Sequence, residues 1–312
     1  MSLQTILERY PRHSTSGVPE WMLGCFRRQC ISFANGESDH QTTVYWLQSR
    51  HLTVDLRLPR FDQRVTSTLL DRSTSDWKAL SQYEGWSALA HWDGQQLSWS
   101  ETTALQNHNR WPEPACLRRV GNCMIEFAPS GAYVEDWRLQ PSEPGPLIGL
   151  RLREETRLDT GERIPRDGAL IIAGRYAGLV LGRTQPLPDS HSTLTEQVNV
   201  QLDKSASPAP LFDFETSIAE GSLTQGFTVQ HSTRPERCGN PLWPESDFEW
   251  LPDQQQVRQR WHQGDHHYER RFEVDSLEPH YPFKLSTPST PESNRWFEQE
   301  AATLTRYTRH LF

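Results

Sequence analysis

Short runs that alternate apolar and polar residues, or that are apolar throughout, recur along most of the chain. Gly, Pro, Asn and Asp separate these runs, and this texture is typical of antiparallel β-strands. In the first half, the predicted strands are 30–33, 42–48, 52–59, 86–92, 96–101, 123–128 and 132–139. In the second half, they are 147–158, 168–175, 177–183, 194–202, 211–219, 226–232, 255–263 and 268–274. The pattern therefore predicts a mostly β protein.

Two turn sequences indicate how neighbouring strands of the first half are joined. Asp93-Gly94 lies between two predicted strands, and both residues tolerate the positive φ of a tight hairpin turn. Pro129-Ser130-Gly131 separates two further strands with similar turn chemistry. We therefore expect antiparallel hairpins at both places.

Helical spacing is clearest at the two ends of the chain. A short helix is predicted over residues 2–10, with Leu3, Ile6, Leu7 and Tyr10 on one face. Near the other end, Ser289 and Glu292 have the spacing of a capping box. Apolar residues then follow at helical intervals: Trp296, Phe297, Ala301, Leu304, Tyr307 and Leu311. We expect this amphipathic C-terminal helix to plug or cover a barrel rather than to recruit a partner.

A segment with three prolines, 140–146, interrupts the strand pattern near the middle of the chain. It predicts a first domain over residues 1–143 and a second over 147–312. Segments 42–57 and 168–183 each look like two strands that end in Arg, which suggests a divergent duplication. Closed barrels suit many short strands because closure removes unpaired edges. We therefore expect two antiparallel β-barrels in tandem.

Charge and composition exclude several classes of protein. The formal net charge is −8 without a long basic run, which disfavours a nucleic-acid partner. No apolar stretch approaches the roughly 18 residues of a membrane span. The N-terminus does not resemble a secretory signal, and an odd number of cysteines, 5, fits reduced thiols, so a cytoplasmic location is expected.

The same survey predicts no metal and no cofactor. No Cys-x-x-Cys pair suggests a zinc site. Neither a phosphate-binding loop nor a dinucleotide-binding turn is present, and no G-x-S-x-G elbow marks a hydrolase nucleophile.

Four segments together resemble a known family: 18–36, 42–59, 124–138 and 212–235. They are similar to the uncharacterised Hri-type (Hrr-interacting protein) family of fungi and bacteria. The most specific parts are the W-L-Q run before the D-L-R-L-P strand, and the Y-x-E-x-W strand. The resemblance implies two lipocalin-like, or calycin, β-barrels in tandem. The family has no assigned enzymatic activity that could be transferred to this chain.

The candidate site is predicted from the alternation of side chains along two strands of the first half. Thr53, Asp55 and Arg57 share one face of their strand, and Tyr133, Glu135 and Trp137 share one face of another. The sharpest hypothesis places these charged and hydroxyl groups inside the first barrel. The predicted ligand-binding residues are Trp46, Asp55, Arg57, Trp99, Tyr133, Glu135 and Trp137. Arg57 would anchor a ligand carboxylate with its guanidinium fork.

Two other interpretations of the same strands stay open. Arg57 could pair with Asp55 or Glu135 and serve only to neutralise buried charge. Alternatively, this face could lie in solvent, with Val54, Leu56 and Leu58 in the core, because antiparallel sheets usually bury their apolar face. In the second half, Arg183 could meet Glu215 across the second barrel.

Three functions follow from these alternatives. The leading hypothesis is a lipocalin-like binder of a small, partly apolar molecule, with an anionic group as one option. The second is an interaction or scaffold protein without a pocket, for which a protein partner or a homodimer is expected. The third is a calycin-like isomerase or decarboxylase with Asp55 or Glu135 as its base beside Tyr133.

Overall fold

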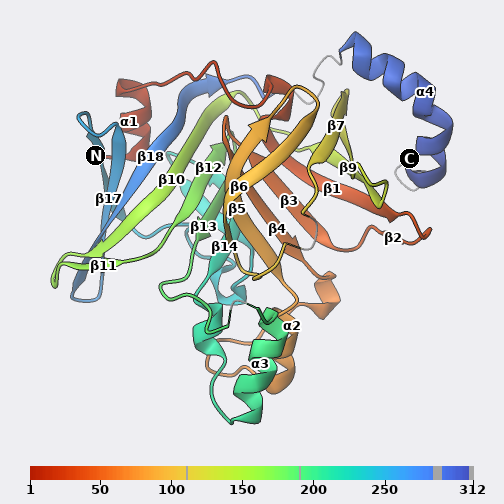
Figure 1. The fold of residues 1–312 in the computed structure, drawn as a ribbon. Helices are drawn as coiled ribbons and strands as arrows, with labels where there is room; N and C mark the ends of the chain where they lie inside the picture. The colour runs from red at the N-terminus through yellow and green to blue at the C-terminus, as the bar shows by residue number, and fades with distance from the viewer. Residues whose placement is uncertain (110–111, 190, 284–289, 309–312) are drawn as a thin grey trace.

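A closed barrel occupies the first half of the chain (Figure 1). The computed structural model describes residues 1–109, 112–189, 191–283 and 290–308. The first sheet consists of β1 (Gly24–Phe33), β2 (Ser38–Asp39), β3 (Thr43–Gln48), β4 (Leu52–Leu58), β5 (Glu84–Trp92), β6 (Gln96–Ala104), β7 (Ala115–Val120), β8 (Cys123–Phe127) and β9 (Tyr133–Leu139). Because β9 pairs back onto β1, eight antiparallel strands form a ring, with β2 attached to β1.

The second half forms a separate antiparallel sheet. Its strands are β10 (Gly145–Arg157), β11 (Glu162–Ile164), β12 (Gly168–Ala173), β13 (Tyr176–Leu181), β14 (Glu215–Ser222), β15 (Gly226–Ser232), β16 (Ser246–Leu251), β17 (Gln256–Gln263) and β18 (His266–Tyr281). The order is β15-β14-β13-β12-β10-β18-β17-β16, with β11 beside β10. Within the described residues, the end strands β15 and β16 do not pair with each other, so the predicted second closed barrel is not found.

Neighbouring segments, rather than closure, cover the two edges of this sheet. The Leu242 amide donates to the Phe227 carbonyl beside β15. At the other edge, the Phe248 amide of β16 donates to the carbonyl of Met1. Edge hydrogen-bonding groups are therefore satisfied without a ring, which removes the reason for expecting closure.

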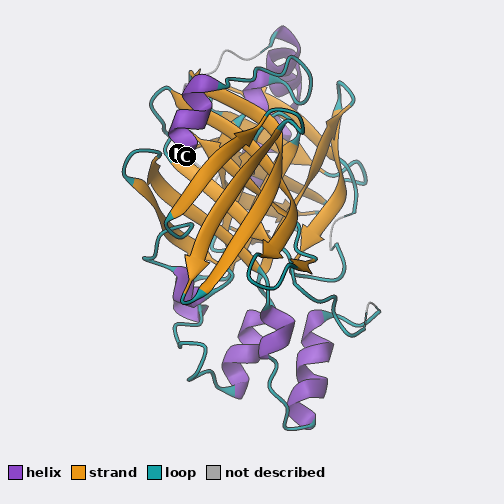
Figure 2. Ribbon diagram, turned by 90° about the vertical axis from the view of Figure 1, so that its left-hand side faces the viewer, coloured by secondary structure: helices purple, strands orange, loops and turns teal. Residues whose placement is uncertain are grey.

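Four α-helices accompany the sheets in the described ranges: α1 (Leu3–Arg9), α2 (Thr74–Leu80), α3 (Leu194–Asp203) and α4 (Pro291–Thr308). Short 3-10 helices cover Glu20–Met22, Phe61–Gln63, Ala209–Phe212 and Pro235–Arg237. The predicted N-terminal helix is confirmed, but α1 packs against β16 and β18 of the second half. Helices α2 and α3 lie side by side below the sheets (Figures 1 and 2).

The strand predicted over 194–202 is wrong, because this segment is helix α3. Its apolar residues Val198, Val200 and Leu202 alternate, which suggested a strand. However, Thr193 and Glu196 form a complete capping box at its start. Leu194 and Val198, four residues apart, are buried, whereas Val200 is exposed, so the buried positions follow helical spacing.

The predicted C-terminal helix is present as α4, and it lies against β7 and β1. The Trp296 ring stacks on Phe127 with a centroid distance of 6.1 Å. The Thr290 hydroxyl accepts a hydrogen bond from the Ser293 amide at the start of the helix. Ser289 and Leu311, which belonged to the sequence prediction, lie outside the described residues.

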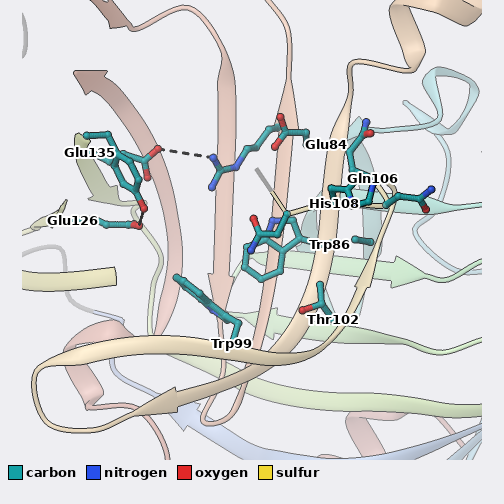
Figure 3. Close-up of a pocket in the computed structure, with 14 residues that line it drawn as sticks. Glu84, Trp86, Trp99, Thr102, Gln106, His108, Glu126 and Glu135 are labelled. Atoms are coloured by element: carbon teal, nitrogen blue, oxygen red, sulfur yellow. Dashed lines mark hydrogen bonds and ion pairs between the residues drawn. The ribbon is translucent and has the colours of Figure 1, made fainter. Parts of the chain in front are cut away.

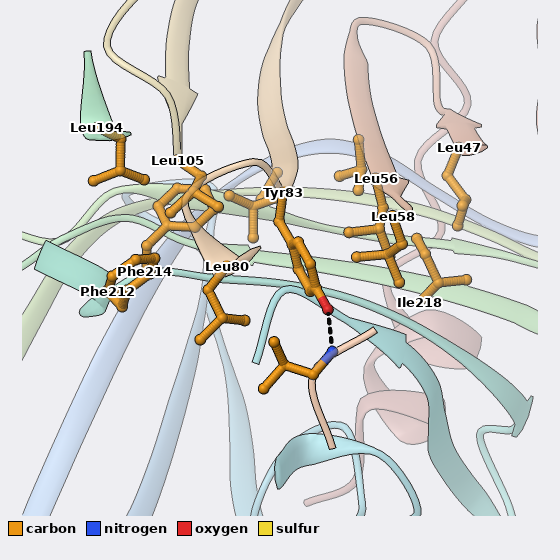
Figure 4. Close-up of a cluster of buried hydrophobic side chains, with 14 of the residues drawn as sticks. Leu47, Leu56, Leu58, Leu80, Tyr83, Leu105, Leu194, Phe212, Phe214 and Ile218 are labelled. Atoms are coloured by element: carbon orange, nitrogen blue, oxygen red, sulfur yellow. Dashed lines mark hydrogen bonds between the residues drawn. The ribbon is translucent and has the colours of Figure 1, made fainter. Parts of the chain in front are cut away.

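The two halves share a continuous apolar core (Figure 4). Strand β4 contributes Val54, Leu56 and Leu58 from its outer face, and strands β12 to β14 contribute residues that pack against it. Strands β13 and β4 approach each other closely at Gly178, which has no side chain. A Cβ atom at this position would lie only 3.0 Å from Val54. The predicted end of the first domain at residue 143 falls between β9 and β10, whereas residue 147 already belongs to β10. Whether the halves are independent domains stays a prediction.

Polar contacts reinforce this junction. Arg50, at the β3–β4 turn, donates two hydrogen bonds of 2.8 and 3.1 Å to Glu278 of β18. The neighbouring His51 lies 2.8 Å from Asp275, and this hydrogen bond is the main cause that raises the pKa of His51. The β3–β4 hairpin is therefore held by the second sheet through both apolar and charged contacts.

Because the core is shared, a cavity made on one side should destabilise the whole molecule. We expect Leu56→Ala to lower the free energy of unfolding by about 2–5 kcal/mol. Denaturant unfolding followed by tryptophan fluorescence and by far-UV circular dichroism should show one coincident transition. Leu70, which is 95% exposed, gives the control Leu70→Ala with little change. Two separated transitions would show that the halves unfold independently.

Candidate functional site

The barrel of the first half contains a cavity of about 400 Å³ (Figure 3). Its walls come from β4, β5, β6, β8 and β9, because inward-facing positions alternate along each strand. The lining residues are Arg57, Glu84, Gly85, Trp86, Trp99, Thr102, Ala104, Gln106, Asn107, His108, Asn109, Glu126, Tyr133 and Glu135. This volume suits one small organic molecule.

Strand β4 is buried on both of its faces, which decides the orientation that the sequence left open. The face with Thr53, Asp55 and Arg57 points into the barrel, and Asp55 is only 2% exposed. The opposite face packs against the second sheet. The solvent-facing interpretation is therefore wrong, because both faces of an antiparallel strand can be buried when a second layer covers the barrel.

Arg57 is held by carboxylates on its own wall of the cavity. Its Nε donates to Asp55 Oδ1 at 2.9 Å, and its Nη1 lies 4.0 Å from Glu135 Oε1. Burial alone would lower the pKa of Arg57, but the surrounding carboxylates outweigh it and hold this pKa above its ordinary value. Burial raises the pKa of Asp55, and Arg57 opposes that effect. The ion-pair interpretation therefore describes Arg57, and a ligand carboxylate would have to compete with Asp55.

Glu135 has a second arginine that sequence reasoning did not include. Arg28, on β1, donates from Nη1 to Glu135 Oε1 at 2.7 Å and from Nη2 to Asp39 at 3.0 Å. The Arg28 side chain is only 5% exposed. Glu135 is thus a buried, neutralised carboxylate, which makes it a poor general base.

Glu126 was not among the predicted site residues. Among the described residues, and unlike those of Asp55 and Glu135, its carboxyl group has only uncharged hydrogen-bond donors as partners. It lies directly opposite Glu135 across the β8–β9 pair. Its partners are the indole of Trp137, which donates at 2.9 Å, and the Tyr133 hydroxyl, which donates at 3.2 Å. Burial, and secondly the charge of Glu135, raise the pKa of Glu126 to about 8.

The sequence did contain a signal for this residue. The Pro129–Gly131 turn closes the β8–β9 hairpin as predicted, and Gly131 has φ +75°. With that turn fixed, residue 126 must stand opposite residue 135, and directly opposed side chains share a face. A prediction that Glu135 points inward therefore also predicts an inward Glu126.

Tryptophan rings form the apolar side of the cavity and the packing behind it. Trp99 and Trp86 line the cavity, and their rings meet edge to face with centroids 5.6 Å apart. Trp46 and Trp137 lie behind them, edge to face at 5.3 Å, and both are buried. Of the seven predicted residues, Arg57, Trp99, Tyr133 and Glu135 line the cavity, whereas Trp46, Asp55 and Trp137 support it.

Hydrogen bonds fix the segment after β6, which forms part of the rim. Gln106 donates to the carbonyls of Ser81 and Tyr83 at 2.9 and 2.6 Å. Asn107 donates to the carbonyl of Ser192, just before helix α3, at 2.8 Å. The rim of the first-half cavity is therefore attached to the second half.

The predicted contact between Arg183 and Glu215 in the second half is wrong. Arg183 donates instead to the carbonyls of Leu211, Ala104 and Leu105, so it bridges the two halves. Glu215 accepts a 2.9 Å hydrogen bond from Arg237. The two arginines that the sequence comparison aligned thus have different partners, because Arg57 faces a cavity and Arg183 faces the junction.

Among the residues that the structure describes, no group of three or more His, Cys, Asp or Glu side chains is placed to hold a metal ion. None of the described helices is long and apolar enough to cross a membrane.

Comparison with known proteins adds one structural likeness. The structure is similar to the crystal structure of the uncharacterised protein YLR301w from Saccharomyces cerevisiae, with a TM-score of 0.46 and 12% sequence identity. The similarity covers 83% of this chain and 99% of that chain. No family model and no curated protein matches the sequence. Function therefore has to be argued from the cavity itself.

Proposed function

We propose that this protein binds a small, partly apolar molecule inside the barrel of its first half. The observation that carries the proposal is the cavity of about 400 Å³, with indole walls on one side and converging charged and hydroxyl groups on the other. Such a combination of apolar surface and a few oriented polar groups is the usual composition of a ligand pocket.

The arrangement supports binding better than catalysis. Asp55 is bonded to Arg57 and Glu135 to Arg28, so the two residues predicted as bases both have cationic partners. The interaction or scaffold function, the cytoplasmic location and the membership of the Hri-type, lipocalin-like family remain predictions from the sequence. The scaffold function does not require a cavity.

An uncharged fluorescent probe tests the proposal without knowledge of the natural ligand. N-phenyl-1-naphthylamine should bind with increased emission, and Ala104→Trp should abolish this signal because the new indole would occupy the cavity. We expect Trp99→Ala to weaken probe binding about tenfold, since it removes one aromatic wall.

The matched control is Trp250→Ala, a partly buried tryptophan of β16 outside the cavity. It should leave probe binding within about twofold of the wild type. Native mass spectrometry of gently purified protein should also reveal a bound small molecule. If the probe fails to bind, or if Ala104→Trp binds it normally, the proposed function is wrong.

A further inference from the structure

We propose that the cavity selects a cation: an organic ammonium group held between Glu126 and Glu135, with an apolar body against Trp86 and Trp99. This inference rests on the proposed function, because it names the ligand class of the same cavity. Four observations support it.

The first observation is the direct opposition of two carboxyl groups. Glu126 and Glu135 are register partners in the β8–β9 pair and both line the cavity. Like charges directly opposite each other destabilise a sheet. Arg28 already neutralises Glu135, so a positive charge bound between the two groups would compensate Glu126 when the cavity is occupied.

The second observation is the difference between the two partners. Glu135 has Arg28 at 2.7 Å and Arg57 at 4.0 Å. In the part of the chain that the structure describes, no Lys, Arg or His nitrogen lies within 4.0 Å of the Glu126 carboxyl, which receives only the two neutral donors Trp137 and Tyr133. These donors are aimed at both oxygens, an arrangement that favours a carboxylate. Burial and the charge of Glu135 oppose ionisation, and the described residues supply no close cation, so a bound ammonium ion would provide the counter-charge that the carboxylate form of Glu126 lacks.

The third observation is the charge of the lining. Glu84, Glu126 and Glu135 line the cavity, whereas Arg57 is the sole Arg or Lys among the described lining residues. Asp55 already occupies Arg57, so an anionic ligand would have to compete with a buried carboxylate for this guanidinium. A cationic ligand needs no such displacement and could pair with Glu126.

The fourth observation is the aromatic wall. Ammonium groups are attracted to the faces of indole rings, and the attraction grows when water is excluded. Trp86 and Trp99 meet edge to face, so their rings present two differently oriented surfaces to the cavity. Carboxylates and indoles together recognise an alkyl- or arylalkylammonium ion, and the volume of the cavity admits one such molecule.

Three indole compounds of similar size separate charge from shape: tryptamine, tryptophol and indole-3-acetate. By isothermal titration calorimetry at pH 7.5, tryptamine should bind at least about tenfold more tightly than tryptophol, and indole-3-acetate more weakly than both. In Glu126→Gln, the preference for tryptamine over tryptophol should fall below about threefold. Tryptophol binding should be retained, which would show that the cavity is intact. Glu245→Gln, at an exposed glutamate, should behave as the wild type.

A pH series gives a second readout. Glu126 must lose its proton to pair with an ammonium ion, so tryptamine affinity should rise from pH 6 to pH 9 in the wild type and stay nearly flat in Glu126→Gln. The groups that act on Glu126 are Glu135 and Tyr133 from β9 and Arg57 from β4. Tryptamine remains an ammonium ion over this range, so the slope reports the protein.

The outcomes separate this inference from the proposed function. If N-phenyl-1-naphthylamine binds but tryptamine shows no preference over the other two compounds, or does not bind, the cation inference is overturned and the binding function stands. If neither the naphthylamine probe nor any indole compound binds, both fail.

Discussion

Replacing Trp137 by alanine is expected to lower the free energy of unfolding by about 3–5 kcal/mol. Its side chain is fully buried in the barrel, packs edge to face on Trp46, and donates a 2.9 Å hydrogen bond to Glu126. The substitution therefore creates a large cavity and also removes a donor from a buried carboxyl group. Urea denaturation at pH 7 measures the change directly.

Two further variants serve as controls for the stability loss of Trp137→Ala. Trp137→Phe keeps most of the apolar volume but loses the donor, so it should cost less than Trp137→Ala. Leu70→Ala, at a 95% exposed position, should change stability by less than about 0.5 kcal/mol. A loss below about 1 kcal/mol for Trp137→Ala would contradict the tight packing of the barrel interior.

Glu126→Gln is expected to make the protein more resistant to unfolding at high pH. The pKa of Glu126 is raised from its ordinary value of 4.5 to about 8, first by burial. A raised pKa means that the stabilising contribution is fully present below about pH 4.5 and is lost as the pH rises through 8. Above that pH the buried carboxylate should cost on the order of a few kcal/mol, and glutamine carries no such penalty.

The measurement is the difference in unfolding free energy between Glu126→Gln and the wild type at several pH values from 5 to 9. This difference should grow in favour of the variant as pH rises, while groups common to both proteins cancel. Glu245→Gln, at an exposed glutamate outside the cavity, is the matched control. Parallel curves for Glu126→Gln and the wild type would mean that Glu126 titrates normally.

Local sequence patterns predicted most of the strands and the hairpins of the first half. Asp93 accepts hydrogen bonds from the amides of Gln95 and Gln96, and Gly94 has φ +102°, so that turn forms as its residues suggest. The pattern does not predict strands β2, β7, β11 and β16. Helix α3 differs from the predicted strand because a capping box starts a helix in a segment whose apolar residues alternate.

In the candidate site, the sequence pattern predicts which side chains share a strand face but not which distant strands contact each other. Alternation correctly grouped Asp55 with Arg57 and Tyr133 with Glu135, because side chains of a strand alternate irrespective of its surroundings. It did not show that Arg28 reaches Glu135, since β1 and β9 are far apart in the sequence and meet only where the ring closes. The same closure brings the uncompensated Glu126 into the cavity.

The sequence alone determined which residues share a strand face and where the chain turns, because both depend on backbone geometry within a few residues. The tertiary structure decided which of those faces meets a cavity, which meets the other half, and whether a sheet closes. Those outcomes depend on burial and pairing between distant segments, as β4 illustrates: Arg57 faces the cavity and Leu56 faces the second sheet. The Leu56 face would have been turned to water had the second half of the chain not covered it.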